Sequence, residues 1–187
     1  MRQLRGCAAN RRYDALVWPA WLVPVLGSEW DRGRVVLDQF AVYAAVDAQR
    51  RSQGIPWTAV SREIGVAPST IARLQAGNAA ETDGLLAILR WLGSTPEDFA
   101  GQAPGGTVRA LGPGRLNTQW LFEALDEKRT ESGLNWTHVA AEVGGTTGVA
   151  LRALARGGRI HIDLLLGCLR WLGRSSGEFV DPDFQHP

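Results

Sequence analysis

The side chains best suited to chemistry in this chain are two hydroxyls and a guanidinium, those of Ser69, Thr70 and Arg73. They stand close together in the stretch TAVSREIGVAPSTIARLQAG (residues 58–77). An arginine offers a fork of donors that can bind guanine through two hydrogen bonds. Serine and threonine can bond several bases, and the threonine methyl can touch a thymine methyl. These residue types therefore suit the recognition of base edges.

Patterns typical of enzymes are missing from the sequence. It contains no phosphate-binding GxxxxGK, no His-Glu-x-x-His, no nucleophile elbow and no convincing pair of catalytic carboxylates. The glycine-rich GGTTG (residues 144–148) lacks the lysine and the preceding strand that phosphate binding would need. The histidines are scattered, and Cys7 and Cys168 stand far apart without a metal-ligand cluster. We therefore expect no enzymatic activity, no cofactor and no metal site.

The length, net charge and cysteine content of the chain limit the kinds of protein that it can be. The 187 residues suffice for one ordinary domain or two small ones. The net charge of +1 argues against a polybasic, non-specific nucleic-acid binder. The low cysteine content indicates a reduced, cytoplasmic protein. The apolar run at residues 16–27 is too short to span a bilayer and has no cleavage pattern after it, so we expect neither a membrane anchor nor a signal peptide.

The chain contains an internal repeat. VYAAVDAQRRSQGIPWTAVSREIG (residues 42–65) aligns without a gap with LFEALDEKRTESGLNWTHVAAEVG (residues 121–144). DGLLAILRWLGSTPEDF (residues 83–99) aligns with DLLLGCLRWLGRSSGEF (residues 163–179), now one residue further along. The second copy therefore carries one inserted residue, which falls in GGTTG. Two matched blocks in the same order indicate a duplicated domain.

The repeat divides the chain into a first domain at residues 37–100 and a second at residues 116–180. Residues 1–36 are an N-terminal extension that either packs on the first domain or stays loosely ordered, and residues 181–187 are a tail. The connection at residues 101–115 is rich in glycine and proline and free of acidic residues, which is typical of a flexible linker. Its cations, Arg109 and Arg115, leave a second interpretation open, a basic arm that touches phosphates or a minor groove.

Apolar residues recur at helical spacing in both copies and no segment alternates with period two, so we predict an all-α fold. In the first copy we expect helices at residues 37–52, about 57–64 and 82–92, and in the second copy a helix at residues 161–172. A glycine follows the end of each within two residues. Capping signals at Thr95 and Ser175 indicate a last short turn in each copy. Tryptophans recur at equivalent places, so we interpret them as core anchors rather than stacking platforms; these are Trp57 and Trp136, and Trp91 and Trp171.

The stretch at residues 58–77 is best interpreted as two short helices that meet at a corner. Gly65 lets the chain turn through a left-handed conformation, and Pro68 supplies the φ angle of the first turn of the next helix. Ile71 and Leu74 then face the core at i, i+3 spacing, which leaves Ser69, Thr70 and Arg73 pointing outward. A helix, a tight turn and a helix with an exposed polar face have the layout of a helix-turn-helix.

Each copy resembles the helix-turn-helix domain of the lambda-repressor/Cro (XRE) family. The resemblance lies in WTAVSREIGVAPSTIARLQAGN followed by DGLLAILRWLG and TPEDF, and it is weaker in the second copy. It implies two tandem five-helix domains joined by a Gly/Pro-rich linker, in a repressor-like transcriptional regulator that binds specific double-stranded DNA. By position, the residues at base edges would be Pro68, Ser69, Thr70 and Arg73. The groups at phosphates would be the Trp57 amide and Thr58.

The second copy departs from this pattern in its third helix. Its reading face is either Gly148, Val149 and Ala150 or Thr147, Gly148 and Val149, and neither set offers much hydrogen bonding. The position of the inserted residue also decides whether Arg152 occupies the place of Arg73, and the sequence leaves both alignments open. The resemblance still allows contacts with the DNA backbone from Thr137, Thr146, Thr147 and Arg152. The second domain is thus either a weak, shape-reading DNA module or a degenerate domain kept for packing.

The net negative charge of the first copy opposes DNA binding, because residues 37–100 contain five arginines and seven acidic residues. An alternative function is therefore a helical module that binds a protein partner, such as an antitoxin-like protein, with DNA binding lost or secondary. The duplication would give one chain the two-fold arrangement that such proteins usually obtain by dimerising. The chain can replace a dimer in this way or form part of a homodimer.

Overall fold

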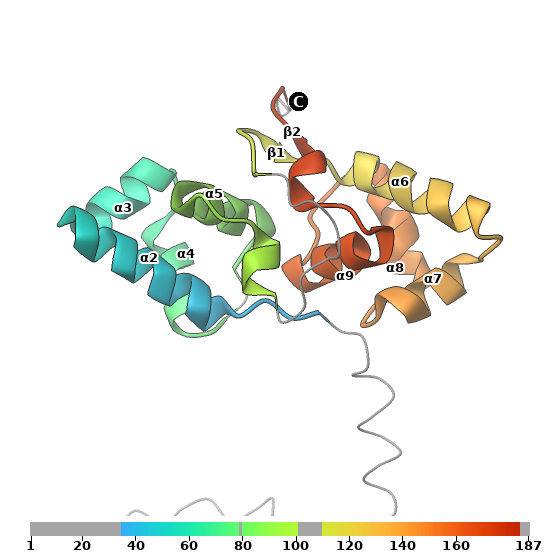
Figure 1. Ribbon diagram of the computed structural model, residues 1–187, viewed down its shortest axis with the longest axis horizontal. Helices are drawn as coiled ribbons and strands as arrows, with labels where there is room; N and C mark the ends of the chain where they lie inside the picture. Colours follow the sequence, from blue (N-terminus) through green and yellow to red (C-terminus); the bar gives the residue numbers. More distant parts are fainter. Residues whose placement is uncertain (1–34, 79, 101–109, 184–187) are drawn as a thin grey trace, which may run out of the picture.

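The computed structural model describes residues 35–78, 80–100 and 110–183. They form two helical lobes that lie side by side (Figure 1). The first lobe contains α2 (Gln39–Gln53), α3 (Trp57–Ile64), α4 (Pro68–Gln75), α5 (Thr82–Leu92) and the 3-10 turn η1 (Pro96–Phe99). The second contains β1 (Arg115–Leu116), α6 (Thr118–Glu131), α7 (Trp136–Val143), α8 (Gly148–Ala153), the 3-10 turn η2 (Leu154–Arg156), α9 (Ile162–Leu172), the 3-10 turn η3 (Ser176–Glu178) and β2 (Val180–Asp181).

The described residues are mostly helical, as predicted, with one correction. β1 and β2 form an antiparallel pair in which Leu116 lies opposite Val180, although no strand was expected. Within the described ranges, no helix is long and apolar enough to cross a membrane. The same ranges hold no group of three metal-ligating side chains. The extension at residues 1–34, residues 101–109 with Arg109, and the tail from residue 184 lie outside the described residues.

The predicted corner is confirmed. Gly65 ends α3 in the left-handed conformation, with φ 79° and ψ 26°, and its amide donates to the Ser61 carbonyl at 3.0 Å. Pro68 is the first residue of α4. Ile71 and Leu74 are buried on the inner side of that helix. Ser61 is buried in the face of α3, where a small side chain lets the two helices approach.

The two lobes close in the same way. In the first, Leu37 bridges Ala100, and the Asp38 amide donates to the Phe99 carbonyl at 2.9 Å. In the second, Leu116 pairs with Val180, and the Asn117 amide donates to the Phe179 carbonyl at 2.8 Å. Asp38 and Asn117 also cap the following helices through their side chains. Both predicted capping boxes, at Thr95 and Ser175, are present.

The tryptophans are packing residues, as predicted. The Trp57 ring stacks on Tyr43 with centroids 5.4 Å apart, and the Arg50 guanidinium lies 4.8 Å from its centroid. The second lobe repeats this cluster with Trp136, Phe122 and Arg129. The indole nitrogens of Trp91 and Trp171 donate to Glu63 and Glu142. Cys168 is fully buried, and burial raises the pKa of its thiol to about 12, so it behaves as a small apolar residue.

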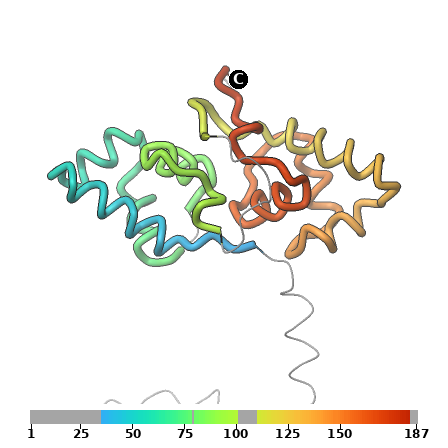
Figure 2. Tube along the Cα trace, in the orientation of Figure 1, coloured from blue at the N-terminus to red at the C-terminus, as the bar shows by residue number. Residues whose placement is uncertain are grey.

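The lobes are joined by reciprocal contacts. Asp83, at the start of α5, binds Arg115 of β1, while its counterpart Asp163, at the start of α9, accepts from the Leu37 amide at 3.2 Å. Each aspartate thus binds the segment that precedes the first helix of the other lobe. Figure 2 shows the segment before α2 reaching the second lobe. Reciprocal contacts of this kind are those of a two-fold interface.

The arrangement in Figure 1 agrees with an approximate two-fold axis along the view. A half-turn in the plane of the picture carries α2 onto α6, α3 onto α7 and α5 onto α9. Such a rotation preserves depth, so it brings α4 and α8 to the same face of the molecule. The internal repeat of the sequence is therefore matched by an internal symmetry of the fold.

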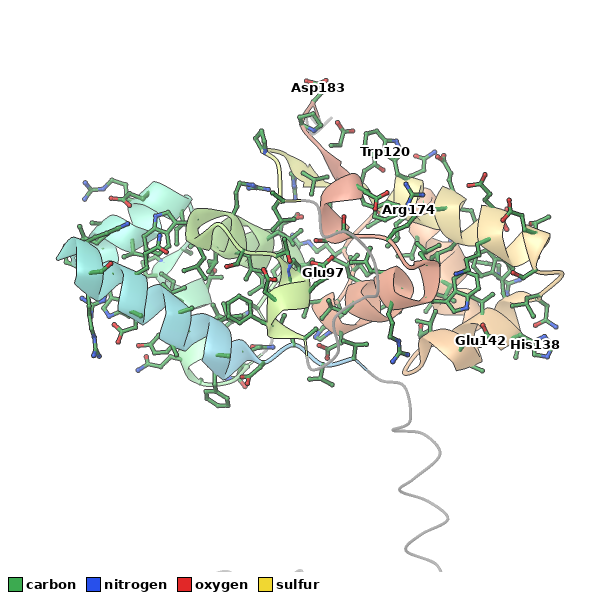
Figure 3. The ribbon with its side chains drawn as sticks, in the orientation of Figure 1. Glu97, Trp120, His138, Glu142, Arg174 and Asp183 are labelled. Carbon is green, nitrogen blue, oxygen red and sulfur yellow. The ribbon has the colours of Figure 1, made fainter. Side chains whose placement is uncertain are left out.

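A buried carboxylate lies where the lobes meet (Figure 3). Glu97 of η1 is only 2% exposed and accepts hydrogen bonds from the amide and hydroxyl of Ser176, at 2.6 and 2.8 Å. Ser176 is completely buried. Thr82 adds a hydrogen bond to the Ile160 carbonyl across the same interface. Polar groups buried in this way hold one geometry, because any slip would leave them without partners.

The described end of the predicted linker is packed rather than free. Leu111 is buried. The Arg90 guanidinium donates to the carbonyls of Gly112 and Gly114, at 2.7 and 2.9 Å. Arg115 binds Asp83, so its charge is engaged at the interface and not in a basic arm. The flexible-linker prediction is thus wrong for residues 110–115.

Gly114 gives a direct test of this packing. It has φ 120°, and a Cβ atom there would lie 2.1 Å from the Asp181 carbonyl oxygen. We expect Gly114→Ala to separate β1 from β2 and to lower the free energy of unfolding by about 1–3 kcal/mol. Gly112→Ala is the matched control, since a Cβ there would meet nothing within 4 Å. Equal denaturation midpoints for the two variants would contradict the packed connection.

Candidate nucleic-acid interface

The outer side of α4 carries most of the side chains expected to read DNA. Pro68, Ser69 and Arg73 are exposed, opposite the buried stripe of the helix. Thr70 requires a correction, because it is half-buried and does not point freely outward. Its methyl carbon would lie 3.3 Å from a Cβ placed on Gly84 of α5. Thr70 therefore packs between α4 and α5, since α5 passes close to it.

The same exposed side extends to a residue that the sequence pattern had not singled out. Gln75, the last residue of α4, is exposed and lines a hollow of about 190 Å³ with Thr58, Pro68 and Ala72. A helical projection of PSTIARLQ would have found it, because Gln75 falls beside Pro68 at the edge of the exposed arc that runs through Ala72 and Ser69 to Arg73. A glutamine side chain can bind adenine through two hydrogen bonds.

The starts of α3 and α4 have backbone amides that no side chain caps. Pro56 and Ala67 occupy the two capping positions, and neither supplies a side-chain acceptor. The first amides of a helix have no acceptor within the helix, and they favour anions. Thr58 is exposed and Trp57 half-buried at the start of α3. These two helix starts thus suit the phosphate contacts expected from Trp57 and Thr58.

In the second lobe, the buried residues of α8 decide the alignment that the sequence left open. Leu151 and Leu154 are buried like Ile71 and Leu74, so the inserted residue lies before α8. The residues that correspond to Pro68, Ser69 and Thr70 are therefore Gly148, Val149 and Ala150. Thr147 is not part of it, since it caps the helix. Ala153, rather than Arg152, takes the place of Arg73.

The helix starts of the second lobe are already capped. Asn135 accepts from the His138 amide at 3.0 Å, and Thr147 accepts from the Ala150 amide at 3.2 Å. The remaining residues expected near phosphates are exposed Thr137 and Arg152, and half-buried Thr146. A side chain thus caps one amide at each of these helix starts, whereas no side chain caps α3 or α4.

Val149 is the most exposed large apolar side chain in the described residues, at 70%. It borders a hollow of about 680 Å³ between α7 and α8. Gly148 permits the close approach of these helices, because a Cβ there would lie 3.0 Å from the backbone of Trp136. Apart from Arg152, the exposed side chains of α8 are therefore apolar, whereas Ser69, Arg73 and Gln75 make the exposed side of α4 polar.

The acidic excess of the first lobe lies away from α4. The sequence of α4, PSTIARLQ, contains no acidic residue. Four carboxylates bind groups in the lobe interface or in a cap, namely Glu81, Asp83, Glu97 and Asp98. Asp47 binds Arg50 and Arg51 on α2, and the hydrogen bond from Arg50 together with both positive charges lowers its pKa. The local charge at the exposed side of α4 is that of Arg73.

No family model matches this chain, and no curated protein or solved structure is similar to it at a significant level.

Proposed function

We propose that the chain is a sequence-specific double-stranded DNA-binding regulator, built from two helix-turn-helix domains, that reads the major groove with α4. The observation that carries this proposal is the polar, exposed side of α4 beside the uncapped starts of α3 and α4. Arg73, Ser69 and Gln75 supply hydrogen bonds to base edges, while the helix starts supply donors to phosphates. A repressor acts by such binding alone, since occupying a promoter excludes other proteins.

The charge distribution supports specific rather than general binding. Among the described residues, α4 itself carries a single cation, Arg73, so contacts made by this helix release few counterions and their salt dependence is modest. Base contacts must then supply much of the affinity. A protein of this kind binds a selected sequence and discriminates strongly against random duplex DNA.

Selection from a pool of random duplexes at low salt tests the proposal. The full chain is expected to enrich a motif that contains a guanine, and binding to that motif should fall only modestly between 50 and 200 mM salt, by about tenfold or less. Arg62→Ala is a suitable control, because Arg62 is exposed on α3 but is not on α4. Absence of any enriched motif would overturn the proposal and favour the protein-binding alternative.

A further inference from the structure

The relative position of α4 and α8 is fixed by the lobe interface. Glu97 and Ser176 are buried there, and Thr82 binds the Ile160 carbonyl. The reciprocal contacts of Asp83 and Asp163 add two further links between the lobes. The approximate two-fold axis brings both helices to one face (Figure 1). A duplex bound to that face therefore meets two different helices in one fixed geometry.

The exposed residues of the two helices differ in chemistry at each equivalent position. Ser69 corresponds to Val149, and Arg73 corresponds to Ala153. Val149 and Ala150 are exposed, so neither contributes to the core of the second lobe. At the positions of Ser69 and Arg73, α8 thus presents methyl groups in place of hydrogen-bonding groups, with the exposed Arg152 beside them.

Among the bases, only thymine presents a methyl group in the major groove, and apolar side chains contact it there. Removing both groups from water stabilises such a contact. The segment Gly148–Arg156 also contains Arg152 and Arg156, both exposed, and has no acidic residue. Its charge therefore suits the neighbouring phosphates while its apolar side chains suit thymine.

We propose that the DNA target is asymmetric: α4 reads one half-site through hydrogen bonds, and α8 reads a thymine-containing half-site through Val149 and Ala150. This inference rests on the proposed DNA-binding function. It assigns the second lobe a reading role of its own and excludes a palindrome within the target of one chain, because such a palindrome requires two equal reading helices. The half-sites lie about one helical turn, about 34 Å, apart.

Selected duplexes that carry deoxyuridine in place of thymidine test the role of the methyl groups. This exchange removes one methyl group and leaves base pairing unchanged. In the second half-site it is expected to weaken binding of the full chain about three- to fivefold for each contacted methyl. The loss should become smaller in Val149→Ser, which introduces the residue of the first lobe at an exposed position and leaves only Ala150 to contact a methyl group. Deoxyuridine outside both half-sites is the control and should leave the affinity unchanged.

The outcomes separate this inference from the proposed function. Two unlike half-sites at a fixed spacing, with the expected sensitivity to methyl removal, support it. A palindromic motif, a single half-site, or unchanged affinity after methyl removal would overturn it and leave DNA reading by α4 in place. Failure to select any motif would overturn both.

Discussion

Arg73→Ala is expected to weaken binding to the selected duplex about ten- to a hundredfold and to erase the preference for guanine at one position. Arg73 is exposed on α4, and it has no counterpart arginine on α8. A bidentate contact with guanine contributes about 1–3 kcal/mol of discrimination. Competition binding with four duplexes that differ only at that position measures both effects.

Two variants separate base reading from charge. Arg73→Lys keeps the positive charge but loses the fork, so it should recover part of the affinity and little of the guanine preference. Arg62→Ala removes the same charge from a nearby exposed position and should change affinity less than threefold. If Arg73→Ala and Arg62→Ala weaken all four duplexes equally, Arg73 contacts phosphate or nothing, and the assignment of its role is wrong.

Glu97→Ala is expected to lower the free energy of unfolding by about 2–4 kcal/mol, which corresponds to a fall in Tm of about 5–15 °C. The change leaves the buried amide and hydroxyl of Ser176 without their acceptor. Thermal and urea denaturation of the full chain measure the loss. Glu127→Ala, which removes an exposed carboxylate from α6, is the control and should change stability by less than about 0.5 kcal/mol.

A double-mutant cycle shows whether the loss comes from the lobe interface. If Glu97 acts through Ser176, then Glu97→Ala and Ser176→Ala together should cost less than the sum of the two single changes. The same Glu97 variant should also lose the fixed spacing between the half-sites, because the lobes would no longer hold one geometry. Additive effects with unchanged spacing would show that this contact does not couple the lobes.

Local backbone chemistry explains why much of the fold could be predicted from the sequence. Gly65 and Pro68 determine the corner through their own φ preferences, and Thr95 and Ser175 form their capping boxes within four residues. The repeat also revealed the equivalent tryptophans. Each of these predictions depends on neighbours in sequence or on a direct comparison of the two copies.

The features that were missed depend on contacts between distant residues. In the sequence, Glu97 is one residue of the segment capped by Thr95, and only the folded chain brings it to Ser176, 79 positions away. Thr70 occupies an outward position in the simplest helical pattern, yet α5 passes close enough to cover it. The alignment of α8 required the burial of Leu151 and Leu154, because the glycine-rich corner tolerates an insertion at several places.

The central claim is that the exposed side of α4 enters the groove of a duplex, and site-specific crosslinking tests it most directly. A photoreactive amino acid at Ser69 is predicted to crosslink the full chain to bases in a random duplex pool at low salt, with the yield concentrated on the selected motif. The same group at Glu131, exposed near the end of α6, should give no such crosslinks. Crosslinks of equal yield from both positions, or none from Ser69, would contradict the account.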